Sequence, residues 1–113
     1  MIDIEQKYKI VIDRPIGYID AFNNQYKINY GYIPLILGGD GEGQDVYIID
    51  EIVPLGECEK YIIAIVHRND DVETKWIGSS NKNISETEIW SKIYFIEQHF
   101  DSYIEMLNQS YTL

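Results

Sequence analysis

Between Tyr8 and Gly78 the chain is a succession of short runs that either alternate apolar and polar residues or are rich in β-branched and aromatic residues. Clusters of Gly, Asp and Asn separate the runs, as turns separate β-strands. The clearest runs are YKIVID (8–13), DVYIID (45–50), YIIAIV (61–66) and VETKWIG (72–78). Several short strands in succession predict a small β-barrel over about residues 8–78.

The sequence SETE at residues 85–88 has the form of a capping box, in which Ser85 caps the amide of Glu88 and Glu88 reaches back. Apolar residues then recur in steps of three and four, which is the spacing of one helix face. They are Ile89, Ile93, Ile96, Phe100, Tyr103 and Leu107. We therefore predict an amphipathic helix over about 85–109 that packs on the barrel, and a single domain over residues 1–113.

The chain of 113 residues has 19 acidic and 9 basic side chains and a formal charge of −10. Such a surface repels phosphate backbones and anionic lipids, so we expect no nucleic-acid and no membrane partner. The lone Cys58 forms no intrachain disulfide, no signal peptide is visible, and the longest apolar run is too short to cross a bilayer. These features predict a cytoplasmic protein. Ten tyrosines are compatible with a homo-oligomeric interface or with core packing.

An acidic loop, GGDGEGQD at residues 38–45, crowds Asp40, Glu42 and Asp45 between two predicted strands. The simplest interpretation is a solvated hairpin turn, because Asp-Gly favours such turns. A calcium EF-hand is excluded, because Asp45 takes the position that requires glycine and strands flank the loop. The remaining interpretation is that the loop binds a cation, which would offset the repulsion between like charges.

A second acidic cluster follows the run YIIAIV. Asp71, Glu73 and Lys75 alternate, so on a strand they would project from one face, and Asp70 precedes them. Asp13 ends the first alternating run. The alternative for this cluster is a solvated strand face. If the acidic residues instead converge at one barrel mouth, they offer the oxygen ligands that Mg2+ prefers.

The segments YKINYGYIP and DGEGQDVYI resemble the core of the family I soluble inorganic pyrophosphatases, whose pattern is N-Y-G-[YF]-I followed by D-x-D-P-x-D. Tyr30 and Asp40 keep the ten-residue separation, and the loop keeps the i, i+2, i+5 spacing of its acidic residues. NDDVETKW resembles the later D…D-x-K element of the family, and IDRP resembles its early acidic residue before proline. The resemblance covers about residues 10–76. It implies a mainly β fold, with a closed, OB-like, five-stranded barrel and a C-terminal α-helix.

The resemblance also implies a role for each matching residue. The cofactor would be Mg2+, with Mn2+ as an alternative, and a water activated by the metal would hydrolyse inorganic pyrophosphate to two phosphates. The metal ligands would be Asp40, Asp45, Glu73 and either Asp70 or Asp71, with Asp13 assisting further metal ions. The catalytic and substrate-binding residues would be Glu42, which assists the water, Lys75, which binds phosphate, Tyr30, which lines the site, and Arg14 or Lys27, in place of a family arginine or lysine.

Two departures from the family pattern suggest an alternative function. Glu42 and Gly43 stand where the family has aspartate and proline, and Phe100 and Asp101 stand where it has a Tyr-Lys pair that grips phosphate. The alternative function is therefore a divergent protein that binds metal and a phosphorylated ligand with little or no turnover. A third possibility is a barrel used for protein contact, whose acidic loops are merely solvated. His67 and His99 have no metal-ligand spacing, and we expect them to be structural.

Overall fold

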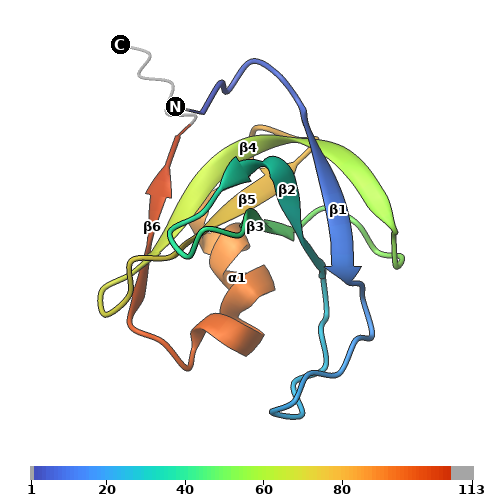
Figure 1. Ribbon diagram of the computed structural model, residues 1–113, viewed down its shortest axis with the longest axis vertical. Helices are drawn as coiled ribbons and strands as arrows, with labels where there is room; N and C mark the ends of the chain where they lie inside the picture. Colours follow the sequence, from blue (N-terminus) through green and yellow to red (C-terminus); the bar gives the residue numbers. More distant parts are fainter. Residues whose placement is uncertain (1, 108–113) are drawn as a thin grey trace.

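Five strands close into a β-barrel in the computed structural model, which describes residues 2–107 (Figure 1). The order around the barrel is β1-β2-β3-β5-β4, and pairing of β4 with β1 closes it. The parallel pair is β3 with β5, and the other pairs are antiparallel. The elements are β1 (Tyr8–Arg14), β2 (Asn29–Leu37), β3 (Gly43–Ile48), β4 (Glu57–Arg68), β5 (Thr74–Ser79), α1 (Glu86–Glu97) and β6 (Ser102–Met106). The predicted fold class is therefore confirmed.

Strand β4 is long enough to carry two partners on the same edge. Its first half pairs with β1, with Tyr8 opposite Lys60, and its second half pairs with β6, with Ala64 opposite Met106. The other edge pairs with β5. The sixth strand thus extends the sheet beyond the closed barrel.

The helix begins as the capping box predicts and packs on the barrel. The Oγ of Ser85 accepts a hydrogen bond from the Glu88 amide at 3.1 Å. Ile89, Ile93 and Ile96 are buried against barrel residues, and each such side chain contributes roughly 1.5–3 kcal/mol by leaving water. Figure 1 shows α1 beneath the strands. Within residues 2–107, no helix is both long and apolar enough to cross a bilayer.

The NYGY segment requires its glycine because β1 approaches β2 closely. Gly31 lies opposite Ile12, and a Cβ on Gly31 would stand 1.9 Å from the carbonyl oxygen of Val11. Only glycine permits this approach of two backbones. The neighbouring Tyr30 is thereby held at the start of β2, where its side chain is buried.

The predicted helix over 85–109 is wrong beyond its first half. The helix ends at Glu97, and Ser102–Met106 forms β6 on the edge of β4. Phe100 and Tyr103, expected on the buried stripe, are 42% and 50% exposed. The segment pairs instead because β4 offers an open edge whose backbone groups need partners. Residues 108 and 109 of the predicted helix lie outside the described residues.

The predicted strand over 72–78 begins later than expected. Strand β5 starts at Thr74, so Asp71 lies in the preceding turn and does not share a strand face with Lys75. The Oδ1 of Asp71 accepts a hydrogen bond from the Glu73 amide at 3.0 Å. Asp readily caps its own turn in this way, and this local bond competes with strand pairing.

Candidate functional site

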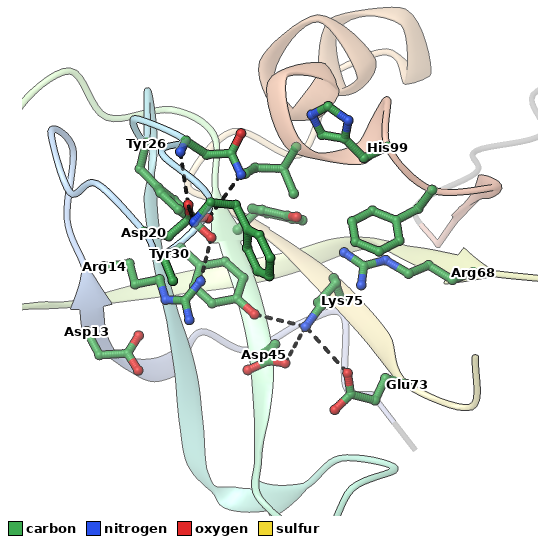
Figure 2. Close-up of a pocket in the computed structure, with 16 residues that line it drawn as sticks. Asp13, Arg14, Asp20, Tyr26, Tyr30, Asp45, Arg68, Glu73, Lys75 and His99 are labelled. Atoms are coloured by element: carbon green, nitrogen blue, oxygen red, sulfur yellow. Dashed lines mark hydrogen bonds and ion pairs between the residues drawn. The ribbon is translucent and has the colours of Figure 1, made fainter. Parts of the chain in front are cut away.

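A cavity of about 680 Å³ opens where β1 and β4 end and where β2 and β5 begin (Figure 2). The end of α1 and the loop between β1 and β2 form its other walls. Six of the residues predicted to bind metal or substrate line it, namely Asp13, Arg14, Tyr30, Asp45, Glu73 and Lys75. The closed barrel brings these residues together from four strands and the segment just before β5.

Lys75 lies among the polar groups of the cavity and is only 8% exposed. Its Nζ donates to the hydroxyl of Tyr30 at 2.9 Å and to Oδ2 of Asp45 at 2.6 Å, and it lies 3.8 Å from Oε2 of Glu73 (Figure 2). Burial, together with the nearby Asp45 carboxylate, raises the pKa of Tyr30 far above its ordinary value. Tyr30 therefore keeps its proton, and Lys75 is the cation of this cluster.

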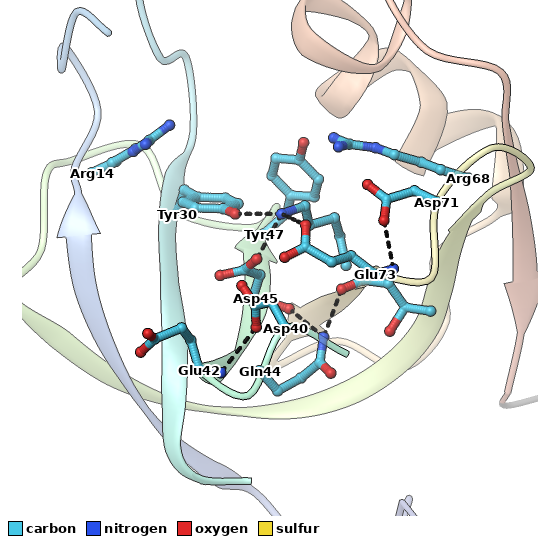
Figure 3. Close-up of polar contacts among 12 residues, drawn as sticks. Arg14, Tyr30, Asp40, Glu42, Gln44, Asp45, Tyr47, Arg68, Asp71 and Glu73 are labelled. Atoms are coloured by element: carbon cyan, nitrogen blue, oxygen red, sulfur yellow. Dashed lines mark hydrogen bonds and ion pairs between the residues drawn. The ribbon is translucent and has the colours of Figure 1, made fainter. Parts of the chain in front are cut away.

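Asp40 and Glu73 form a carboxyl pair next to this lysine. The hydrogen bond between the two groups raises the pKa of Glu73, and burial adds to the effect. The pKa of Asp40 is lowered, first by the hydrogen bond from the Glu42 amide at 3.0 Å and then by the bond with Glu73. The repulsion between these two neighbouring carboxyl groups, both labelled in Figure 3, can be offset by a cation.

Asp13 and Arg14 stand at the opposite wall of the cavity from Glu73 and Arg68 (Figure 2). Burial raises the pKa of Asp13, and the charge of Asp45 adds a smaller contribution. The Nη1 of Arg14 donates to the hydroxyl of Tyr26 at 2.7 Å. The guanidinium is thus fixed by one bond and keeps other N–H groups for a ligand.

These carboxylates suit a partly hydrated Mg2+ ion rather than a metal enclosed entirely by protein ligands. Among residues 2–107, no three acidic, histidine or cysteine side chains are grouped so that they could hold a metal ion. Mg2+ is usually bound through one or two carboxylates, with waters and substrate phosphates completing its shell. The Asp40–Glu73 pair supplies that number, and Asp45 adds a third carboxylate only by giving up its contact with Lys75.

Four predicted residues do not line the cavity. Asp40 and Glu42 are exposed on the loop between β2 and β3, and Asp70 and Asp71 are exposed in the turn before β5. Asp40 still reaches the site through its bond to Glu73.

The structure also distinguishes among the residues that the sequence offered as possible phosphate ligands, because only some of them line the cavity. Arg14 lines the cavity, whereas Lys27 lines a different hollow beside α1. Phe100 lines the cavity, but Asp101 does not. His99, expected to be structural, lines the cavity too. His67 lies elsewhere, with its Nε2 2.8 Å from Oε1 of Glu105.

Arg68 is a cavity residue that the sequence analysis missed. It ends β4, and its Nη2 and Nε donate to the Glu97 carboxylate at 2.6 and 3.2 Å. Its guanidinium also lies 3.6 Å from the centre of the Phe100 ring. The double hydrogen bond and the ring contact fix the orientation of this cation at the cavity wall.

Glu97 is the buried partner that holds Arg68. It is 1% exposed and also accepts hydrogen bonds from Tyr47 at 2.6 Å and Ser102 at 2.7 Å. A signal for it was present in the sequence, because Glu97 follows Ile89 and Ile93 in steps of four. A carboxylate on a buried helix face requires a charged or hydrogen-bonding partner.

No family model matches the chain, and no curated protein matches it in sequence. Solved structures do match. An inorganic pyrophosphatase from Ehrlichia chaffeensis superposes with a TM-score of 0.70 at 14% identity, over 92% of this chain and 88% of that one. One from Coxiella burnetii gives 0.62 at 16% identity over 93% and 86%, and one from Thermus thermophilus gives 0.57 at 16% identity over 91% and 81%. This chain therefore has a pyrophosphatase-like fold, and the resemblance inferred from NYGYI and the acidic loop is confirmed at the level of the fold.

Proposed function

We propose that the protein hydrolyses inorganic pyrophosphate to two phosphates in a reaction that depends on Mg2+ or Mn2+. The observation that carries this proposal is the cavity, in which carboxylates and cations from separate strands converge within a pyrophosphatase-like fold. The pyrophosphate anion needs both kinds of group, because cationic side chains bind its oxygens and carboxylates hold the metal ion.

In this proposal Asp40, Asp45 and Glu73 hold the metal, Asp13 assists a further ion, and Asp70 or Asp71 approaches from the turn. When bound, the metal lowers the pKa of a coordinated water and offsets the charge on the phosphates. Because Glu42 is exposed on its loop, its proposed role of orienting the water requires that the loop close over the substrate.

The cationic residues would act on the phosphate oxygens. Water attacks one phosphorus, the bond from that phosphorus to the bridging oxygen breaks, and the bridging oxygen leaves with the second phosphate. Lys75 would move from Asp45 to the phosphoryl oxygens and offset the charge that develops there. Arg14 and Arg68 would hold the outer oxygens, and Tyr30, which keeps its proton, would donate a hydrogen bond.

The test is release of phosphate from pyrophosphate with Mg2+ or Mn2+. We expect turnover that is lost in Asp45→Asn and is much slower on a chromogenic phosphomonoester, whose single phosphate cannot span metal and Lys75 together. Absence of phosphate release at millimolar metal and substrate would contradict the proposal, and similar rates on the monoester would indicate another class of phosphatase.

The alternative, a protein that binds metal and a phosphorylated ligand with little turnover, is favoured by one specific observation. The Nζ of Lys75 lies 2.6 Å from Asp45, so this carboxylate is already neutralised by the protein itself. Saturable binding of pyrophosphate and Mn2+ without release of phosphate would select this alternative.

Metal binding is expected to stabilise the fold. A metal that binds only the folded chain adds about 2.7 kcal/mol at a concentration one hundred times its Kd. We expect Mn2+ and Mg2+ to raise the melting temperature, and Asp45→Asn to lose most of that increase. Glu59→Gln is the matched control, because Glu59 is exposed on β4 and does not line the cavity. A melting temperature that is indifferent to millimolar metal would count against the site.

A further inference from the structure

Two exposed phenylalanines line the cavity beside its charged residues. Its charged residues include Asp45, Glu73 and Lys75, whereas Phe22 and Phe100 line it from the β1–β2 loop and from the segment after α1. The proposed hydrolysis of inorganic pyrophosphate needs the charged residues and Tyr30, but no apolar contact with the substrate. In the function proposed above Phe22 has no role and Phe100 only supports Arg68, and exposed apolar groups beside a polar site commonly contact a ligand.

Phe22 is presented by an ordered loop although its side chain is 85% exposed. The carboxylate of Asp20 accepts hydrogen bonds from the amides of Phe22 and Asn24, each at 2.9 Å, and from the side chain of Asn24 at 3.1 Å. At the base of the loop, the amide of Tyr26 donates to the carbonyl oxygen of Tyr18 at 2.7 Å. The backbone around Phe22 is therefore fixed, and the exposed ring lines the cavity without being covered by the protein.

Phe100 also lines the cavity and packs against Arg68. The guanidinium of Arg68 packs 3.6 Å from the centre of its ring, and 42% of the side chain remains exposed. Arg68 is in turn held by the buried Glu97. An aromatic ring and a cation that we propose to bind phosphate therefore lie next to each other, and the buried Glu97 holds the cation.

The size of the cavity also exceeds the requirement of pyrophosphate. A volume of about 680 Å³ lies within the range of about 300–1,000 Å³ that holds drug-sized organic ligands. A planar organic group can stack on exposed aromatic rings, and for a nucleobase this is worth a substantial part of the binding energy.

We propose that the site takes an organic diphosphate with a planar ring, of the nucleoside diphosphate class, whose ring contacts Phe22 and Phe100 while its phosphates meet Arg14, Arg68 and Lys75. This inference rests on the proposed phosphate and metal site and names the substrate class. In the reaction, water attacks the terminal phosphorus and its bond to the bridging oxygen breaks. That oxygen keeps the electron pair and leaves on the organic monophosphate, and the proton of the attacking water is released to solvent.

The experiment compares three ligands on the full chain with Mn2+, by calorimetric titration and by phosphate release. Adenosine 5′-diphosphate carries the ring, methyl diphosphate carries the same two phosphates without a ring, and inorganic pyrophosphate reports the proposed function. The variants are Phe22→Ala and Phe100→Leu. Tyr94→Ala is the matched control, because Tyr94 is an exposed aromatic residue that does not line this cavity.

We expect adenosine diphosphate to bind at least tenfold more tightly than methyl diphosphate. We expect Phe22→Ala to remove about tenfold of that difference in affinity. Tyr94→Ala should have no effect, and neither variant should change the affinity for pyrophosphate.

Equal binding of the two organic diphosphates, or equal behaviour of Phe22→Ala and Tyr94→Ala, would overturn the inference. If pyrophosphate is still hydrolysed, only the inference fails. Binding of adenosine diphosphate that depends on Phe22, without hydrolysis of pyrophosphate, would support the inference and remove the proposed activity. Failure of all three ligands to bind would remove both.

Discussion

Replacing Glu97 with alanine is expected to lower the free energy of unfolding by about 3–5 kcal/mol. Glu97 is buried and accepts hydrogen bonds from Arg68, Tyr47 and Ser102. Its removal leaves the largely buried guanidinium of Arg68 without an anion and the Tyr47 hydroxyl without an acceptor, and both groups then carry their full desolvation cost. Urea unfolding of the natural protein and of Glu97→Ala measures the difference in the free energy of unfolding.

Two controls separate the charge effect from simple truncation. Glu105→Ala breaks the exposed contact between Glu105 and His67 and is expected to cost less than about 1 kcal/mol. The double variant Arg68→Met with Glu97→Leu removes both charges and is expected to recover much of the loss, because neither partner then remains buried alone. If Glu97→Ala costs no more than Glu105→Ala, the buried ion pair does not stabilise the end of α1.

The Arg68–Glu97 ion pair also makes the free energy of unfolding depend on pH. Burial raises the pKa of Glu97, but hydrogen bonds from Arg68, Tyr47 and Ser102 outweigh it, so the folded pKa lies below the ordinary value of 4.5. The stabilisation is fully present above the unfolded pKa and is lost as the pH falls through the folded value, because the unfolded chain takes up the proton first. Below about pH 4.5 the natural protein should therefore lose stability more steeply than the double variant.

Lys75→Ala is expected to reduce kcat/KM for pyrophosphate at least a hundredfold, which is the usual cost of removing one donor that is aimed at developing negative charge. In the free protein Lys75 binds Tyr30 and Asp45 from a buried position. Its ammonium is therefore held beside carboxylates that we propose as metal ligands, without the freedom of a surface lysine. Steady-state phosphate release measures the effect, and the loss should include kcat if the contact tightens in the transition state.

Two comparisons complete this measurement. Lys75→Arg keeps the charge but replaces a compact ammonium with a planar fork, so we expect only partial rescue. Lys9→Ala removes an exposed lysine that pairs with Glu57 on the barrel wall and should leave turnover unchanged. Equal activity of Lys75→Ala and Lys9→Ala would show that Lys75 only neutralises Asp45.

The sequence contained enough information to predict the barrel and part of the candidate site. The alternation in YKIVID and VETKWIG placed most of the residues of β1 and β5, and SETE marked the start of α1. Tyr30, Asp45 and Lys75 converge because a closed barrel brings neighbouring strand ends to one mouth. Such convergence follows from local periodicity and from knowing that the sheet closes.

The C-terminal part could not be predicted in the same way. Phe100, Tyr103 and Leu107 fit a helical period, yet Ser102–Met106 pairs with β4. The open edge of β4 is a tertiary feature, and pairing with it outweighs the weak preference of a short segment for helix. Arg68 was missed for a related reason, because its partner Glu97 lies 29 residues away and only the folded helix brings the two together.

Strand β4 depends on partners from both ends of the chain, and this arrangement bears on the order of folding. The pairing of Tyr8 with Lys60 joins segments far apart in sequence, so the chain loses considerable loop entropy before this contact stabilises it. The cavity takes Arg14 from β1 and Arg68 from β4, so it does not exist until that pairing has formed. A ligand in the cavity meets only the completed barrel. It would therefore slow the opening of the native state without accelerating its formation.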